Sequence, residues 1–167
     1  MTLIEIMVAI SIMTIVAFGT VSGLLQSRRL TERSIYDNTG ATIAQGYIEQ
    51  MMNMEFTLLD GSVIDQLFSQ GAADSLTVSP SVADPETGDP ATDIVNTKII
   101  DINNTPGDTA DDLEIKLVLY IDNLTDPNNG VGESRRIALR YSYKTISDPG
   151  KSVTYTEFNI RSRVATF

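Results

Sequence analysis

The chain of 167 residues contains no cysteine, no histidine and no tryptophan. Without cysteine it has no disulfide, no thiol nucleophile and no thiolate metal site. Without histidine it lacks the commonest general base and the commonest transition-metal ligand, which excludes Ser-His-Asp catalysis, Cys-His catalysis and ordinary zinc centres. Catalysis would depend on carboxylates, lysine or tyrosine alone. We therefore expect that the protein is not an enzyme and requires no cofactor.

Positive charge is also scarce, because 12 lysines and arginines face 22 acidic residues and the net charge is −10. This balance argues against a nucleic-acid partner. Residues 56–112 contain eleven acids and one lysine, whereas residues 113–167 contain eight bases and six acids. The uneven distribution predicts a strongly negative face and a mildly positive face that can dock head to tail on other copies. Alternatively, the acidic loops only keep the surface soluble.

Charged side chains are nearly absent from the first 27 residues, with Glu5 as the single exception. Residues 6–27 are uncharged, and as a helix they would extend about 33 Å, enough to cross a bilayer. Arg28, Arg29 and Arg33 follow at once, as expected where a span meets water or lipid headgroups. No basic region precedes the apolar run and no small-residue cleavage site follows it, so the segment predicts a membrane anchor and not a cleaved secretory signal.

Glu5 is the anomaly in this segment, because a carboxylate in hydrocarbon costs roughly 2.5–3.5 kcal/mol. No base lies within the first 27 residues, so the nearest cation is an N-terminal amine, either its own or that of a neighbouring copy. A neighbour's amine would set the register of identical helices packed side by side. Alternatively, the carboxylate extends to the membrane surface near the chain end. Gly19 and Gly23 have the small-xxx-small spacing that lets apolar helices approach closely.

The N-terminus Met1-Thr-Leu-Ile-Glu-Ile-Met-Val-Ala-Ile resembles the mature start of type IV pilins and of the related type II secretion pseudopilins, which reads Phe-Thr-Leu-Ile-Glu. The resemblance covers about the first 25 residues. It implies a precursor cut by a prepilin peptidase before Met1, methylation of the new N-terminus, and pairing of Glu5 with a neighbour's amine during assembly. The chain departs from the family at Met1, where Phe is usual, and at Ser22, where many pilins have proline. Gly19 and Gly23 can still let this stretch unwind.

The remaining segments predict a helix followed by strands. Residues 28–55 continue the helix with one apolar stripe at three- and four-residue spacing, formed by Tyr36, Ile43, Ala44, Tyr47, Ile48, Met51 and Met54. Residues 56–112 are expected to be a long, weakly structured acidic connection, with a short helix within 58–68 and one strand within 94–102. From residue 113 to the end, apolar residues alternate with polar ones, which indicates strands.

The predicted fold is therefore α+β, with a long N-terminal helix packed on a three- to four-stranded antiparallel sheet. The helix has a membrane-spanning first half, residues 1–27, and an amphipathic second half, residues 28–55; residues 56–112 connect it to the sheet of residues 113–167. Asn128-Asn-Gly and Asp148-Pro-Gly are expected to form turns, and a change of phase predicts a bulge near Glu157. This arrangement, expected from the periodicity, is similar to the architecture that the resemblance to pilins implies.

Two segments offer the oxygen ligands that Ca²⁺ prefers. One contains Asp122, Asp126, Asn128 and Asn129, and the other contains Asp101, Asn103, Asp108, Asp111 and Asp112. Neither matches the spacing of a known calcium loop, and aspartate and asparagine are also ordinary turn residues. Calcium is a hypothesis here and turn formation is its alternative.

Three functions follow from these observations. The first is a structural subunit that leaves the inner membrane with the pilus assembly machinery and forms a homopolymer, an extracellular filament on the bacterial surface. The second is a secretion pseudopilin or a minor pilin. The third is a membrane-tethered binding domain that never polymerises. Glu5 favours the first two, since a simple anchor needs no acid; the sequence does not distinguish adhesion, motility, DNA uptake and secretion.

Overall fold

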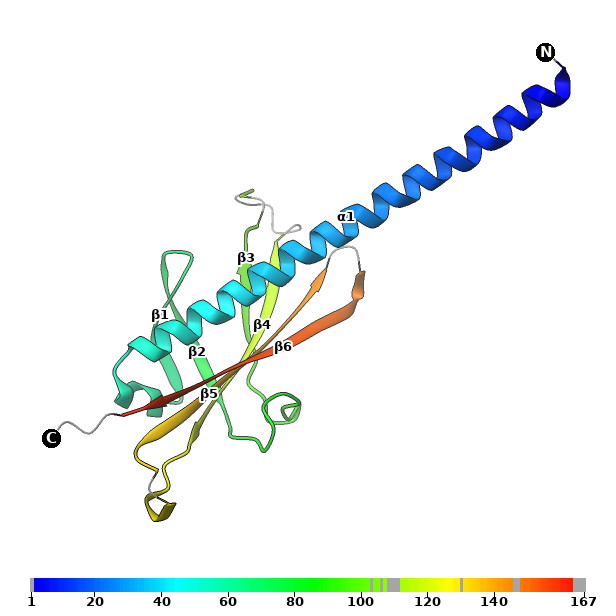
Figure 1. The fold of residues 1–167 in the computed structure, drawn as a ribbon. Helices are drawn as coiled ribbons and strands as arrows, with labels where there is room; N and C mark the ends of the chain where they lie inside the picture. The colour runs from blue at the N-terminus through cyan, green and yellow to red at the C-terminus, as the bar shows by residue number, and fades with distance from the viewer. Residues whose placement is uncertain are drawn as a thin grey trace.

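The structure is a computed structural model that describes residues 2–102, 104–105, 107, 112–129, 131–145 and 148–163. Its dominant feature is α1, Leu3–Asn53, a single helix of 51 residues. Figure 1 shows the N-terminal half of α1 projecting away from the head and the C-terminal half lying across the sheet. A short 3-10 helix, Phe56–Asp60, then leads into the strands. The predicted continuous helix is confirmed.

Within the described residues the sheet contains six strands: β1 Val63–Ser69, β2 Ala72–Ser79, β3 Asn96–Ile100, β4 Leu113–Asn123, β5 Ser134–Thr145 and β6 Asp148–Ser162. Their order is β1-β2-β4-β5-β6, and β3 also pairs with β4. All pairs are antiparallel except β2 and β4, which run parallel through two residue pairs. The α+β class is confirmed, but three or four antiparallel strands was too few, and the sheet is mixed.

The β1–β2 hairpin is the main difference from the sequence prediction, which placed a weakly structured connection and a short helix in this region. Gln70 and Gly71 have φ values of 50° and 79°, the left-handed conformation of a two-residue hairpin turn. Leu67 and Leu76 from the two strands are fully buried. The 3-10 helix takes only the start of the predicted helical range. The acidic connection is therefore largely part of the folded head.

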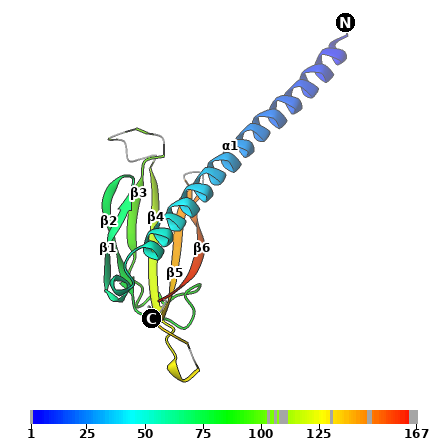
Figure 2. The same cartoon turned by 60° about the vertical axis from the view of Figure 1, so that its left-hand side comes forward.

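The helix packs on one face of the sheet, as Figure 2 shows. The buried stripe on α1 contains Tyr36, Gly40, Ala44, Tyr47, Ile48 and Met51. Ile43 and Met54 are half-buried beside it. Opposite them lie the alternating residues Leu113, Ile115, Leu117 and Leu119 of β4. The predicted stripe on α1 and the predicted alternation on β4 are confirmed. We call the side of the sheet that faces away from α1 the outer face.

Two details near the C-terminus were predicted wrongly. Asp148 begins β6 and pairs with Thr145, so residues 148–150 belong to the strand and not to the turn. The pairing of β5 with β6 is continuous across Glu157, and the shift of register lies instead between Lys144 and Thr145. The reason is that β6 is an edge strand on which apolar side chains such as Phe158 are exposed. The positions of its apolar residues therefore do not show which side of the strand is buried, and a change in their spacing does not indicate a bulge.

Gly40 lies where α1 approaches the sheet most tightly. A Cβ atom there would lie 3.2 Å from Cε2 of Tyr141 and 3.6 Å from Cδ1 of Ile115, whereas one at Gly46 would meet nothing within 4 Å. We expect Gly40→Leu to lower the free energy of unfolding of the head by about 2–3 kcal/mol through overpacking. Gly46→Leu is the control and should raise it by up to about 1 kcal/mol, because leucine favours helix. Denaturant titration in detergent measures both; equal midpoints would contradict this packing.

Candidate functional site

The N-terminal half of α1 is an uncovered apolar surface. Leu3 is 80% exposed, Met13 76% and Phe18 72%, and none of the most apolar 18-residue stretch is buried. By length and composition α1 can cross a membrane. A shallow apolar groove follows one side of it, lined by Ile10, Met13, Thr14, Ala17, Phe18 and Val21. An apolar surface of this extent requires lipid or other protein against it.

Three hydroxyl groups within this apolar surface form hydrogen bonds inside the helix. Ser11 Oγ donates to the Met7 carbonyl at 2.8 Å, and Thr14 Oγ1 donates to the Ile10 carbonyl at 2.7 Å. Thr20 Oγ1 makes a similar bond to a carbonyl one turn earlier. These bonds lower the cost of placing hydroxyls in lipid or between helices. Glu5 is therefore the one charged side chain that an apolar environment would penalise among residues 2–27.

The Glu5 carboxylate caps the start of α1. Its Oε2 accepts a hydrogen bond from the backbone N–H of Thr2 at 3.3 Å, and the Glu5 N–H donates to the Thr2 carbonyl at 3.1 Å. Thr-x-x-Glu is the sequence signal of a capping box, which the sequence interpretation overlooked. Glu5 forms no salt bridge with another described residue. Met1 lies outside the described residues, so pairing of Glu5 with an amine stays a prediction.

Gly19 and Gly23 lie in the middle of the exposed surface. α1 is helical through both positions, and an added Cβ would meet nothing within 4 Å at either. Among the described residues, no contact requires glycine at either position. This arrangement is compatible with close packing against a neighbouring helix, and with local unwinding, since each glycine weakens the helix by about 1 kcal/mol relative to alanine. Both roles remain predictions.

Two tyrosines of the sheet bind α1 near the point where the helix leaves the head. Asp37 of α1 accepts hydrogen bonds from the hydroxyls of Tyr143, on β5, and of Tyr155, on β6, the latter at 3.0 Å. Arg33 Nε lies 3.7 Å from the Asp37 carboxylate. Burial and the bond to Asp37 raise the pKa of Tyr143, so its hydroxyl stays a donor. These contacts join α1 to β5 and β6 near the first buried residue of the helix, Tyr36.

The acidic segment that follows β2 lies against the outer face and is held by two buried aspartates. Asp93 binds Arg140 and accepts a hydrogen bond from the Tyr120 hydroxyl at 2.5 Å. Asp122 binds Arg136 at 2.6 Å and accepts a hydrogen bond from Ser81. The side chains of Asp93 and Asp122 are only 4% and 8% exposed. Val82 packs there on the buried residues Val118, Tyr120 and Ala138.

These pairs change the predicted charge distribution. In the Asp93–Arg140 pair the acid comes from the middle third of the chain and the base from the C-terminal third. The same is true of the pair of Asp60 with Arg135, at 2.5 Å. Part of the charge that would separate two faces is therefore neutralised inside the head. Sequence reasoning missed these pairs; the available signal was the position of Arg136 and Arg140 on the polar phase of a predicted strand.

The proposed calcium residues have other partners in the structure. Asp122 binds Arg136, as described above, while Asp126 accepts hydrogen bonds from the side chain of Asn129 at 2.6 Å and from the backbone of Asn128 at 3.1 Å. These bonds hold the pKa of Asp126 below its usual value, the Asn129 side chain having the largest effect. In the second segment, Asn103, Asp108 and Asp111 lie outside the described residues. Among residues that are described, no group of three acidic side chains is placed to hold a metal, and calcium stays a prediction.

The buried carboxylates predict how stability depends on pH. Burial alone raises the pKa of Asp93, but hydrogen bonds from Tyr120 and from the Asp89 backbone, together with Arg140, outweigh it and hold this pKa below its usual value. The pKa of Asp74 is likewise lowered, since Lys98 and Tyr47 outweigh its burial.

Because both pKa values lie below the unfolded value of about 3.9, this stabilisation is present above about pH 4 and is lost as the pH falls through the folded pKa values. We therefore expect the unfolding midpoint of the head to fall steeply below about pH 4. Asp74→Asn with Asp93→Asn should flatten that dependence in thermal unfolding measured by circular dichroism. An unchanged slope in the double variant would contradict this assignment.

Comparison of the chain with known protein families, curated proteins and solved structures finds no match. The functional interpretation therefore comes from the molecule itself. Its pilin-like architecture, a long N-terminal helix joined to a sheet, is the coarse feature that the structure establishes. An exposed apolar helix with one acid in its first turn is the candidate site.

Proposed function

We propose that this protein is a structural subunit of a type IV pilus-like extracellular filament. The observation that carries the proposal is α1, one unbroken helix whose predominantly apolar first half is exposed and whose second half buries one stripe of side chains against the sheet. In a filament the exposed halves pack together as a central core, and the heads form the surface. Before assembly the same apolar surface is covered by lipid. It is therefore shielded from water both in the membrane and in the filament.

Within this proposal Glu5 selects the position of each new subunit. Lipid chains are as apolar as the helix, so apolar contact alone gives neighbouring helices little preference for one register. A carboxylate that binds the N-terminal amine of its neighbour supplies that preference, because any other register leaves a charge unpaired in an apolar core. Leader cleavage before Met1 by a prepilin peptidase creates that amine. The peptidase and the assembly machinery are partners inferred from the family resemblance.

Secretion pseudopilins and minor pilins share the same helix, so the length and abundance of the fibre separate them from a major pilin. We would shear filaments from the native cells, sediment them and label them with antibodies raised against the head. Abundant, regularly labelled surface fibres are expected. Labelled chain confined to the membrane fraction would contradict the proposal and favour a tethered binding domain.

A further inference from the structure

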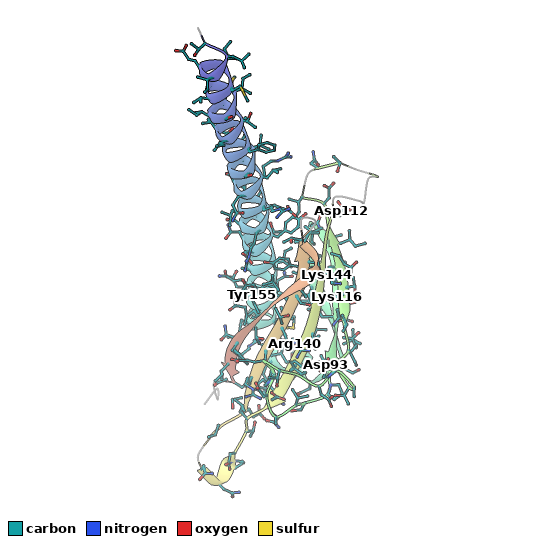
Figure 3. All side chains as sticks on the ribbon, turned by 90° about the vertical axis from the view of Figure 1, so that its right-hand side faces the viewer. Asp93, Asp112, Lys116, Arg140, Lys144 and Tyr155 are labelled. Carbon is teal, nitrogen blue, oxygen red and sulfur yellow. The ribbon has the colours of Figure 1, made fainter. Side chains whose placement is uncertain are left out.

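A second recess lies on the outer face, and we propose that it binds a neutral oligosaccharide. The recess is a groove of about 420 Å³, within the size range of ligand sites. We call it the outer groove, and its lining residues are Glu86, Thr87, Val95, Lys116, Val118, Arg140, Ser142 and Thr154. Figure 3 shows Lys116 and Arg140 following one another down the sheet, with Asp93 next to Arg140.

One wall of the outer groove is held in place before any ligand binds. That wall contains Glu86 and Thr87, and the segment is fixed to the sheet by the buried bonds of Asp93. Gly88 has a φ of 65°, and a Cβ there would overlap the guanidinium of Arg140 and the hydroxyl of Tyr120. The segment therefore crosses directly over these side chains. A preformed wall lowers the entropy cost of binding.

The groups that face the outer groove suit hydroxyl-rich ligands. Lys116 offers three N–H donors. Among the described residues it forms an ion pair with Glu114 alone, at 3.4 Å, and this pair is weak because both side chains are more than half exposed. The Glu86 carboxylate is an acceptor without a salt bridge among the described residues. Ser142 and Thr154 add hydroxyls that donate and accept. Val95 is exposed and supplies apolar contact for the C–H face of a sugar ring.

The charges indicate that the ligand is neutral. Glu86 offsets Lys116, and Asp93 neutralises Arg140, so the outer groove has no excess positive charge for a phosphate or sulfate. The net charge of −10 also repels polyanions. The outer groove lies on the face opposite α1 and so would face outward in the proposed filament, where repetition would strengthen weak binding. That last point rests on the proposed function, whereas binding by a single subunit does not.

The test uses the full chain in phosphatidylcholine nanodiscs, with maltotriose, cellotriose and tri-N-acetylchitotriose as probes, followed by saturation-transfer NMR. We expect at least one probe to bind with a dissociation constant on the order of 1 mM. Thr154→Trp fills the outer groove from an exposed strand position and should weaken binding at least tenfold. Ser152→Trp, on the same strand outside the groove, is the matched control for bulk and should not. Lys116→Ala should also weaken binding, whereas Lys144→Ala should not.

Absence of binding by all three probes would overturn the proposal. Equal affinities of Thr154→Trp and Ser152→Trp would overturn it too, because binding would then lie elsewhere. Polygalacturonate is the anionic control probe. If it alone binds, and Lys116→Ala and Lys144→Ala reduce its binding equally, the surface is generally cationic and the sugar groove is rejected. Because nanodiscs hold isolated subunits, these outcomes are independent of whether the protein forms filaments.

Discussion

Glu5→Gln is expected to remove the protein from filaments while the head remains folded. Glutamine keeps the size and the capping bond to Thr2, because a capping box accepts either residue at this position. It removes the negative charge that binds the neighbour's amine. An ion pair at about 4 Å is worth roughly 4 kcal/mol at an effective dielectric constant of about 20. If the variant loses about 3 kcal/mol of this pairing energy for each added subunit, the affinity of the filament end for a new subunit falls more than ~100-fold.

Sheared filaments from cells that express only the variant give the measurement, with the membrane-bound pool as the reference for expression. Glu49→Gln is the matched control, because Glu49 lies on the same helix outside the apolar half and its carboxylate also binds within the helix, to Gln45. The control should assemble normally, and Glu5→Ala should fail as Glu5→Gln does. If Glu5→Gln assembles normally and Glu5→Ala does not, capping of the helix and not charge pairing is the role of Glu5.

Arg140→Ala is expected to lower the free energy of unfolding of the head by about 3 kcal/mol. The substitution leaves the Asp93 carboxylate, whose side chain is 4% exposed, without its cation. Removing one partner of a buried pair typically costs about 3–5 kcal/mol, and the lower end applies because Arg140 itself is 14% exposed. The acidic segment should also loosen from the outer face, since Tyr120 alone does not neutralise the carboxylate.

Arg163→Ala is the control for Arg140→Ala. Its ion pair with Glu133, at 2.9 Å, joins side chains that are both more than half exposed, so we expect a loss below about 1 kcal/mol. Denaturant unfolding measures the free energies, and hydrogen exchange of residues 80–95 reports the loosening. Asp93→Asn combined with Arg140→Ala should recover part of the lost stability, because no unpaired charge remains. Similar losses for the two arginine variants would show that the Asp93 pair is not a buried clamp.

The parts of the fold that the sequence predicted correctly are those in which burial repeats locally. The stripe on α1 and the alternation on β4 each follow one regular period. β1 shows why its hairpin was missed. A register shift between Ile64 and Leu67 places both residues in the core three positions apart, so the strand does not alternate. The phase of its apolar residues resembles one helical turn, and the prediction of a short helix there follows from this.

The functional residues, too, could be predicted only where the signal lies within one stretch of the sequence. Glu5 could be identified because an acid in an otherwise apolar run is anomalous without any knowledge of the fold. The Asp93–Arg140 pair could not, because its partners lie 47 positions apart and are brought together only by the sheet. Asp122 was expected to be a metal ligand for a similar reason: the sequence shows its neighbours along the chain but not Arg136 beside it on the next strand.

The most direct test of filament assembly through a processed N-terminus is the intact mass, together with the N-terminal peptide mass, of the protein in filaments sheared from its native cells. The proposed function predicts abundant chain that begins at a methylated Met1, because the free amine that pairs with Glu5 exists only after cleavage in front of that residue. A chain found only in membranes, with an unprocessed or unmodified N-terminus, would contradict polymerisation through α1 and leave a tethered binding domain as the better description.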